Sequence, residues 1–222
     1  MITGIKENLE QIKGTLPKNV TLVAVSKTKP ITDIQEAYNA GHRVFGENKI
    51  QEMAEKFEVL PKDIEWHMIG HLQRNKVKYM AHFVSLIHGV DSLKTLIEIN
   101  KQAQKHNRVI NCLLQARIAK EDTKFGLSFS EIEDILASEE IKELHHIKVV
   151  GLMGMATFTE DEKQLQEEFS SLSSFFNKKK ENYSNLTILS MGMSGDYPLA
   201  IKNGSTMVRI GSSIFGVRNY NA

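Results

Sequence analysis

Apolar and polar residues alternate in blocks along the whole chain, and the blocks predict eight strands separated by helices. Short apolar runs without polar alternation are typical of parallel strands that are covered on both faces. Longer segments with apolar residues every three or four positions indicate amphipathic helices. The expected strands lie at 21–26, 42–45, 64–69, 83–87, 109–116, 147–152, 186–189 and 207–210. The expected helices lie at about 2–15, 31–40, 49–59, 74–80, 92–106, 128–137, 160–180 and 198–202.

This alternation predicts the fold class. Strands and helices that alternate through short connections imply right-handed crossovers and a parallel sheet. Eight such units in 222 residues favour an α/β fold with a single (β/α)8 TIM barrel. A doubly wound open sheet is the alternative, but it normally carries a glycine-rich turn after its first strand. Here that turn reads Ser26-Lys27-Thr28-Lys29-Pro30 and has no glycine.

Composition limits the classes of protein without choosing among barrels. The net charge is +1, so no overall field attracts nucleic acid or an anionic membrane. Cys112 is the single cysteine, which rules out a disulfide within the chain and fits a reducing compartment. The chain opens on no apolar signal core, and no window approaches a membrane span. We therefore expect a cytoplasmic protein that forms one domain over residues 1–222.

Lys27 follows the first expected strand directly. The carboxyl ends of parallel strands are where α/β folds place their chemistry. A partly desolvated lysine there loses its proton more easily and can form a Schiff base with an aldehyde. A solvated loop lysine is the common alternative, and this turn alone does not separate the two.

Two loops near the end of the chain are rich in glycine and serine. Residues 191–196 (MGMSGD) follow the seventh expected strand, and residues 211–213 (GSS) follow the eighth. Barrels of this class often bind phosphate with the loops after strands seven and eight. In a closed barrel the first and eighth strands are neighbours. A ligand with an aldehyde at one end and a phosphate at the other would bridge Lys27 and these loops, and pyridoxal phosphate has that shape.

Arg209 lies within the eighth expected strand, two residues before Gly211. If its side chain points into the barrel mouth, it can lie near the pyridine ring of such a ligand. A permanent cation there disfavours protonation of the ring nitrogen and weakens the ring as an electron sink. Strand alternation does not decide between this orientation and an outward one.

Seven motifs occur in this order along the chain: VAVSKTKP, FGEN, IGHLQRNK, VDS, GLMGMAT, SMGMSGD and VRIGSSIFG. In combination they resemble the pyridoxal phosphate homeostasis protein family, the proline synthase co-transcribed bacterial homologues. The resemblance implies a fold type III barrel like the alanine racemase N-terminal domain. It implies a cofactor held as a Schiff base on Lys27, with Arg209 at the pyridine nitrogen. It implies that the phosphate is contacted by Ser194, Gly211 and Ser212. It also implies that the ring pocket is lined by Asn48, Met191 and Gly192.

Two function classes follow from the resemblance. The first is a protein that stores and delivers pyridoxal phosphate in the cell and has no catalytic residues. Its partners would be the cofactor and pyridoxal-phosphate-dependent apo-enzymes. The second is an amino-acid racemase, which needs an acid or base on each face of the ligand. Alanine racemases take the second group from a tyrosine across a subunit interface, and a β domain follows their barrel.

The residues favour the carrier. The chain ends about ten residues after the eighth expected strand, so we expect no C-terminal β domain and a monomer. Tyr197 is the only tyrosine near the expected mouth; the others are Tyr38, Tyr79, Tyr183 and Tyr220.

Metal binding is not predicted. His67 and His71 have the spacing of a metal pair, but only a helix puts positions i and i+4 on one face. Here they flank the end of an expected strand.

Overall fold

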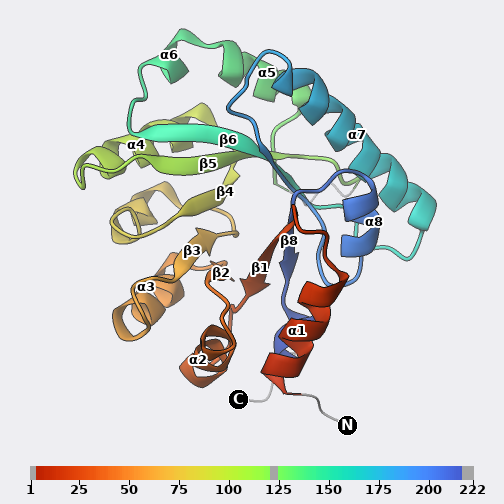
Figure 1. Cartoon of the computed structure of the whole chain (residues 1–222). Coiled ribbons are helices and arrows are strands. Elements are labelled where there is room, and N and C mark those ends of the chain that lie inside the picture. The colour runs from red at the N-terminus through yellow and green to blue at the C-terminus, as the bar shows by residue number, and fades with distance from the viewer. Residues whose placement is uncertain (1–3, 121–124, 217–222) are drawn as a thin grey trace.

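The structure, a computed structural model, describes residues 4–120 and 125–216. Its strands form a closed barrel in which every strand is parallel to its neighbours and the order follows the sequence (Figure 1). The predicted (β/α)8 barrel is therefore confirmed, and the open sheet is excluded. The strands are β1 (Thr21–Val25), β2 (Val44–Glu47), β3 (Glu65–Met68), β4 (Leu86–Val90), β5 (Ile110–Ala116), β6 (Ile147–Gly154), β7 (Ile188–Ser190) and β8 (Met207–Ile210).

Helices surround the ring of strands (Figure 1). Polar caps set their starts where the sequence offers them: Ser92 Oγ accepts the backbone N–H of Thr95, and Ser128 forms a capping box with Glu131. None of the helices in residues 4–120 and 125–216 is long and apolar enough to span a bilayer. The helices are α1 (Ile5–Thr15), α2 (Ile31–Asn39), α3 (Ile50–Val59), the 3₁₀ helix η1 (Arg74–Tyr79), α4 (Leu93–Gln104), α5 (Phe129–Ala137), α6 (Glu139–Lys142), α7 (Glu162–Lys180), α8 (Tyr197–Lys202) and α9 (Ser212–Phe215).

Two predicted strands in the first half of the chain are displaced toward the carboxyl side. The strand expected at 42–45 is β2, and the strand expected at 83–87 is β4. Phe83 is apolar and buried, yet its N–H donates to Met80 O in a turn that continues η1. Gly89, which we expected in a loop, lies within β4, and a Cβ there would come 2.4 Å from the carbonyl oxygen of Gly70. An apolar run indicates which residues are buried, but residues outside the paired part of a strand are buried too. The run therefore does not fix where the strand begins and ends.

Smaller differences concern the helices and the last strands. The segment expected at 74–80 is a 3₁₀ helix, and α6 was not expected. β6 continues through Gly154, two residues past its expected end, and β7 is shifted to Ile188–Ser190. The expected first helix began at residue 2, which lies outside the described residues. β8 has the bounds that the sequence predicted.

Apolar side chains fill two layers of the molecule. A small cluster of strand residues packs together, comprising Val23, Leu86, Leu113, Val150, Met153 and Met207. A larger cluster joins the sheet to the helices, and Phe45, Trp66 and Phe169 are its largest fully buried members. Each large apolar side chain that is fully buried stabilises the fold by roughly 1.5–3 kcal/mol. This packing leaves the carboxyl ends of the strands free to form a site.

Candidate functional site

A cavity of about 1240 Å³ opens among the turns that follow the strands. Its lining includes six of the eight residues singled out in the sequence: Lys27, Asn48, Ser194, Arg209, Gly211 and Ser212. The structure therefore brings the lysine after β1 and both glycine-serine loops to one opening. The volume is above the range of about 300–1,000 Å³ that is usual for sites of drug-sized ligands.

The turn that carries Lys27 is held at its backbone. The Ser26 N–H donates to Gly46 O at 3.0 Å, and the Lys29 N–H donates to Ser26 O at 3.0 Å. Thr28 has a φ of 63°, in the left-handed region that β-branched residues rarely adopt. Its N–H donates to Glu52 Oε1 at 2.6 Å. The residue after Lys27 is therefore strained and is fixed by a side chain of α3.

A buried ion pair lies behind this turn. Lys56 Nζ lies 2.8 Å from Glu47 Oε1, and both side chains are nearly or wholly inaccessible. The same ammonium donates to Ser26 O at 2.8 Å, while Ser26 Oγ donates to Glu47 Oε1 at 2.6 Å. Burial raises the pKa of the Glu47 carboxyl, and the Lys56 ammonium opposes that rise. Ser26, which precedes Lys27, is thus tied to both charges.

Lys29 joins the two sides of the cavity. Its ammonium donates to Phe215 O at 2.8 Å and to Gly216 O at 3.1 Å. These carbonyls lie at the end of α9, the helix that begins at Ser212. Because β1 and β8 are paired neighbours, this contact ties the turn of Lys27 to the loop after β8.

The two glycine-serine loops offer backbone donors to the cavity. Within the described residues, the N–H groups of Ser194, Gly195, Ser212 and Ser213 donate to no protein acceptor. All four residues line the cavity. Ser194 Oγ accepts the Gly211 N–H at 3.3 Å, which links the loops. Clustered backbone N–H groups of this kind form a favourable environment for an anion.

Arg209 points inward, which excludes the outward orientation that the sequence left open. It lines the cavity and is 4% exposed. Its Nη1 donates to Ser190 O at 2.9 Å, and its Nη2 donates to Gly154 O at 3.0 Å. Burial lowers the pKa of Arg209 to about 10, and Asp196 acts in the opposite direction, so the guanidinium is charged at neutral pH.

Asn48 follows β2 and also lines the cavity. Its Oδ1 is buried and accepts no hydrogen bond from any described part of the chain. Buried acceptors are normally paired, so an unpaired one beside a cavity indicates a donor supplied from outside the chain.

Met191 and Gly192 are not among the residues that line this cavity. Met191 is fully buried in the larger apolar cluster. Gly192 has a φ of 97°, and a Cβ there would lie 2.7 Å from the Cβ of Ala200 and 2.9 Å from the Cα of Tyr197. Gly192 therefore allows α8 to pack closely behind the loop that carries Ser194.

Replacing Gly192 with alanine should lower the free energy of unfolding by about 2 kcal/mol, because it combines an unfavourable φ with a clash against α8. Denaturant unfolding measures the change. Gly195→Ala is the matched control, since a Cβ at Gly195 meets no heavy atom within 4 Å. Equal stability of the two variants would contradict the close-packing role of Gly192.

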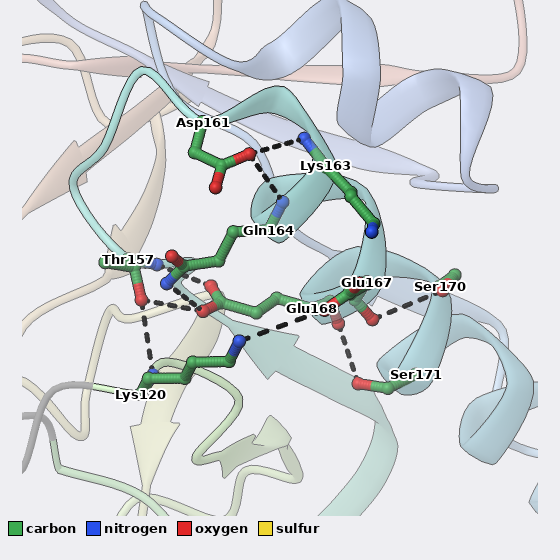
Figure 2. Close-up of polar contacts among 9 residues, drawn as sticks. All are labelled: Lys120, Thr157, Asp161, Lys163, Gln164, Glu167, Glu168, Ser170 and Ser171. Atoms are coloured by element: carbon green, nitrogen blue, oxygen red, sulfur yellow. Dashed lines mark hydrogen bonds and ion pairs between the residues drawn. The ribbon is translucent and has the colours of Figure 1, made fainter.

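Sequence reasoning missed a carboxylate that orders the rim of the cavity. Glu168 of α7 accepts the backbone N–H of Thr157 at 2.7 Å and its hydroxyl at 2.7 Å (Figure 2). The Lys120 N–H donates to Thr157 Oγ1 at 3.2 Å, which ties the loop after β5 to the loop after β6. Burial disfavours the charge on Glu168, but the hydrogen bonds from Thr157 and Gln164 outweigh it and lower its pKa.

A signal for this residue is present in the sequence. Glu168 lies between Leu165, Phe169 and Leu172 on the buried face of α7. A carboxylate on an apolar helix face needs partners, and here the rim loop supplies them.

The two histidines with metal spacing do not meet. His67 is buried and contacts His88, whereas His71 lies 3.3 Å from Asp91 and stacks on Phe125. No group of three or more potential metal ligands occurs within residues 4–120 and 125–216.

Known proteins are similar to this chain in sequence and in fold. The family described as alanine racemase, N-terminal domain, matches residues 2–219. The pyridoxal phosphate homeostasis protein of Pasteurella multocida is 38% identical, with 98% of this chain and 99% of that protein covered. The protein of the same description from Escherichia coli strain K12 is 36% identical, with 99% of each covered.

Two solved structures have the same fold as this chain. PipY of Synechococcus elongatus, solved with pyridoxal phosphate bound, is 34% identical and has a TM-score of 0.86, with 96% of this chain and 100% of that chain covered. Alanine racemase of Clostridium difficile shares the fold at 15% identity, with a TM-score of 0.81 over 99% of this chain and 58% of that chain.

The fold and the cavity define a single-barrel protein built like the N-terminal domain of alanine racemase. Within that class, the chain belongs to the pyridoxal phosphate homeostasis protein family.

Proposed function

We propose that this chain binds pyridoxal 5′-phosphate in the cavity, holds it as a Schiff base on Lys27, and serves in its storage and delivery. The observation that carries the proposal is the shared cavity, which presents Lys27, Arg209 and the donors of both glycine-serine loops together. The relatives named above, and PipY with its bound cofactor, support the choice of ligand.

The residues present fit each part of this cofactor. The free N–H groups of the loops after β7 and β8 suit the phosphate, with Ser194, Gly211 and Ser212 as its contacts. Lys27, on the neighbouring β1 side, suits the aldehyde. The unpaired Oδ1 of Asn48 suits a hydroxyl donor on the ring. Met191 and Gly192 are proposed to act from behind the ring pocket, by packing.

Arg209 suits the ring nitrogen. A guanidinium has five N–H groups. In Arg209, Nη1 donates to the carbonyl and hydroxyl oxygens of Ser190, and Nη2 donates one hydrogen to Gly154 O. Nε–H and the remaining Nη2–H have no acceptor among the described residues. When bound, the cofactor supplies an electron sink for amino-acid chemistry, and a fixed cation at its ring nitrogen weakens that sink.

The same geometry favours a carrier over a racemase. Within the described residues no tyrosine lines the cavity. Tyr197, the tyrosine expected nearest the mouth, instead makes a 3.1 Å hydrogen bond with Thr15 Oγ1 on α1. Tyr220 lies outside the described residues. Among the described residues the cavity therefore presents no tyrosine acid to pair with Lys27, and we propose a protein without turnover that acts in the cell as a monomer. α-Proton exchange of a single-enantiomer amino acid into heavy water, catalysed by the loaded protein, would contradict this.

Lys27→Ala should abolish covalent capture of the cofactor. The protein mixed with pyridoxal phosphate is expected to become yellow, and borohydride should fix one cofactor to the peptide that contains Lys27. Lys49→Ala, an exposed lysine beside Asn48, is the matched control and should be labelled like the unaltered chain. Mass spectrometry after digestion measures both, and a borohydride-stable adduct in Lys27→Ala would refute the assignment.

A further inference from the structure

A chain of buried polar side chains crosses the barrel below the cavity. Arg209 Nη1 donates to Ser190 Oγ at 2.7 Å. Ser190 Oγ lies 3.1 Å from His88 Nδ1, and His88 Nε2 lies 3.1 Å from His67 Nδ1. The four residues come from β8, β7, β4 and β3, and none is more than 4% exposed. Neither the proposed chemistry at Lys27 nor the phosphate loops use the two histidines.

The donors and acceptors of this chain allow one direction in which the hydroxyl hydrogen of Ser190 is used. A guanidinium can only donate, so Ser190 Oγ accepts from Arg209. The hydroxyl hydrogen of Ser190 then has one acceptor in the described structure, which is His88 Nδ1. A neutral His88 that accepts at Nδ1 carries its hydrogen at Nε2 and donates it to His67 Nδ1. The reverse direction would leave the hydroxyl hydrogen of Ser190 without an acceptor.

Burial keeps both histidines neutral. It lowers the pKa of His67 to about 3. It also lowers the pKa of His88 well below its usual value, and electrostatic interactions with His67 and Arg209 act in the same direction. Arg209 is thus the one charged member of the chain.

The acceptors around Arg209 are neutral as well. They are the carbonyl and hydroxyl oxygens of Ser190 and the carbonyl oxygen of Gly154. No carboxylate lies within ion-pair distance of this guanidinium in the described part of the molecule. The site therefore holds this cation by hydrogen bonds to neutral groups, and Asp196 stabilises its charge from beyond ion-pair distance.

We propose that His67, His88 and Ser190 are positioning residues that hold the guanidinium of Arg209 at the cavity, and so keep the ring nitrogen of a bound pyridoxal phosphate unprotonated. This inference rests on the proposed function. It has a structural half, the direction of the hydrogen-bond chain, which concerns the protein alone. It also has a functional half, the effect of that chain on the bound ring nitrogen. The two halves can therefore fail separately.

The structural half is tested without cofactor. Side-chain ¹⁵N spectra of the apo-protein at neutral pH should show both His88 and His67 as neutral rings protonated at Nε2. His88→Gln and Ser190→Ala spectra assign the signals. A His88 ring protonated at Nδ1, or a charged one, would overturn the chain as described whether or not the protein binds any cofactor.

The functional half is tested with ring-¹⁵N-labelled pyridoxal phosphate. Ser190→Ala and His88→Leu should each bind the cofactor about tenfold more weakly, as expected when a hydrogen bond to a charged group is lost or left unsupported. The pH at which the ring nitrogen protonates should rise by about one unit. His88→Gln keeps an acceptor and a donor and should restore both values toward those of the unaltered chain.

The control separates positioning from packing. His42 is also a buried histidine, but it bonds the carbonyl of Val44 and lies outside the chain of four. His42→Leu loses the same imidazole volume and should leave the ring-nitrogen titration unchanged. If His88→Leu behaves like His42→Leu, or if His88→Gln fails to restore the titration in a folded protein, the positioning role is wrong. An unaltered chain that binds no pyridoxal phosphate would refute the proposed function instead.

Discussion

Lys56→Met is expected to lower the free energy of unfolding by about 3 kcal/mol, because it leaves a fully buried carboxylate without its cation. Glu47 has no exposed side-chain surface, and Lys56 provides its ion pair at 2.8 Å. The variant also removes the donor to Ser26 O, the carbonyl next to Lys27. We therefore expect a less stable protein in which the turn that carries Lys27 is held less firmly. Less pyridoxal phosphate should then be fixed to Lys27 by borohydride reduction.

The sign of the pH dependence makes this prediction specific. Burial raises the pKa of Glu47 already, and loss of Lys56 removes the charge that opposes the rise. A carboxyl whose pKa is raised on folding stabilises most at low pH, and that contribution is lost as the pH rises through the folded value. The Lys56→Met defect should therefore be smaller at pH 5 than at pH 8, as read from urea unfolding.

Two further variants complete the design. Glu47→Gln/Lys56→Met removes both buried charges and should recover most of the lost stability, because Glu52, the remaining ion-pair partner of Lys56, is 23% accessible and stays partly solvated. Lys142→Met breaks the exposed pair with Glu139, whose side chains are 61% and 83% accessible, and should change stability little. A double variant as unstable as Lys56→Met would show that packing, and not the buried charge, explains the loss.

Acidification from pH 7.5 to pH 5.5 should lower the free energy of unfolding by about 3 kcal/mol. Three buried histidines are responsible: burial lowers the pKa of His42 to about 4 and of His67 to about 3, and it places that of His88 well below its usual value. Each takes up a proton more readily when the chain is unfolded. The stability that they contribute is complete above the unfolded value of about 6.5 and falls as the pH drops toward the folded values.

Each histidine accounts for about 1.4 kcal/mol over this interval, and Glu47 offsets part of the total because its raised pKa acts in the opposite sense. Urea unfolding at the two pH values measures the loss. His42→Gln, which removes one titrating ring outside the Arg209 chain, should reduce the loss by the contribution of one histidine. A stability that does not change between the two pH values would contradict the neutral, buried state of these rings.

The sequence predicted the barrel and most of the cavity because both depend on local patterns joined by one topological rule. Short apolar runs located the strands, and the rule for the ends of strands one, seven and eight placed Lys27 near Ser194 and Ser212. Arg209 could be assigned to β8 but not to a face of it. Its inward direction follows from the hydrogen bonds to Ser190 and Gly154.

Side-chain contacts between residues that are distant in the sequence could not be predicted from local patterns. His88 and Ser190 are 102 positions apart, and no local period connects them. Glu47 was visible only as part of the FGEN motif, and no pattern in the sequence pointed to Lys56. Met191 and Gly192 were assigned to the ring pocket by resemblance, and neither lines the cavity. At Gly192, a positive φ and the close approach of α8 decide the residue.

The pairing of β1 with β8 places the first and last strands of the barrel at the site. Lys27 follows one of them, Gly211 and Ser212 follow the other, and Lys29 reaches the end of α9. Under the proposed function, the site is complete only after β8 has been translated, because Gly211 and Ser212 follow that strand. A polypeptide that stops before β8 carries Lys27 but lacks these two proposed phosphate contacts.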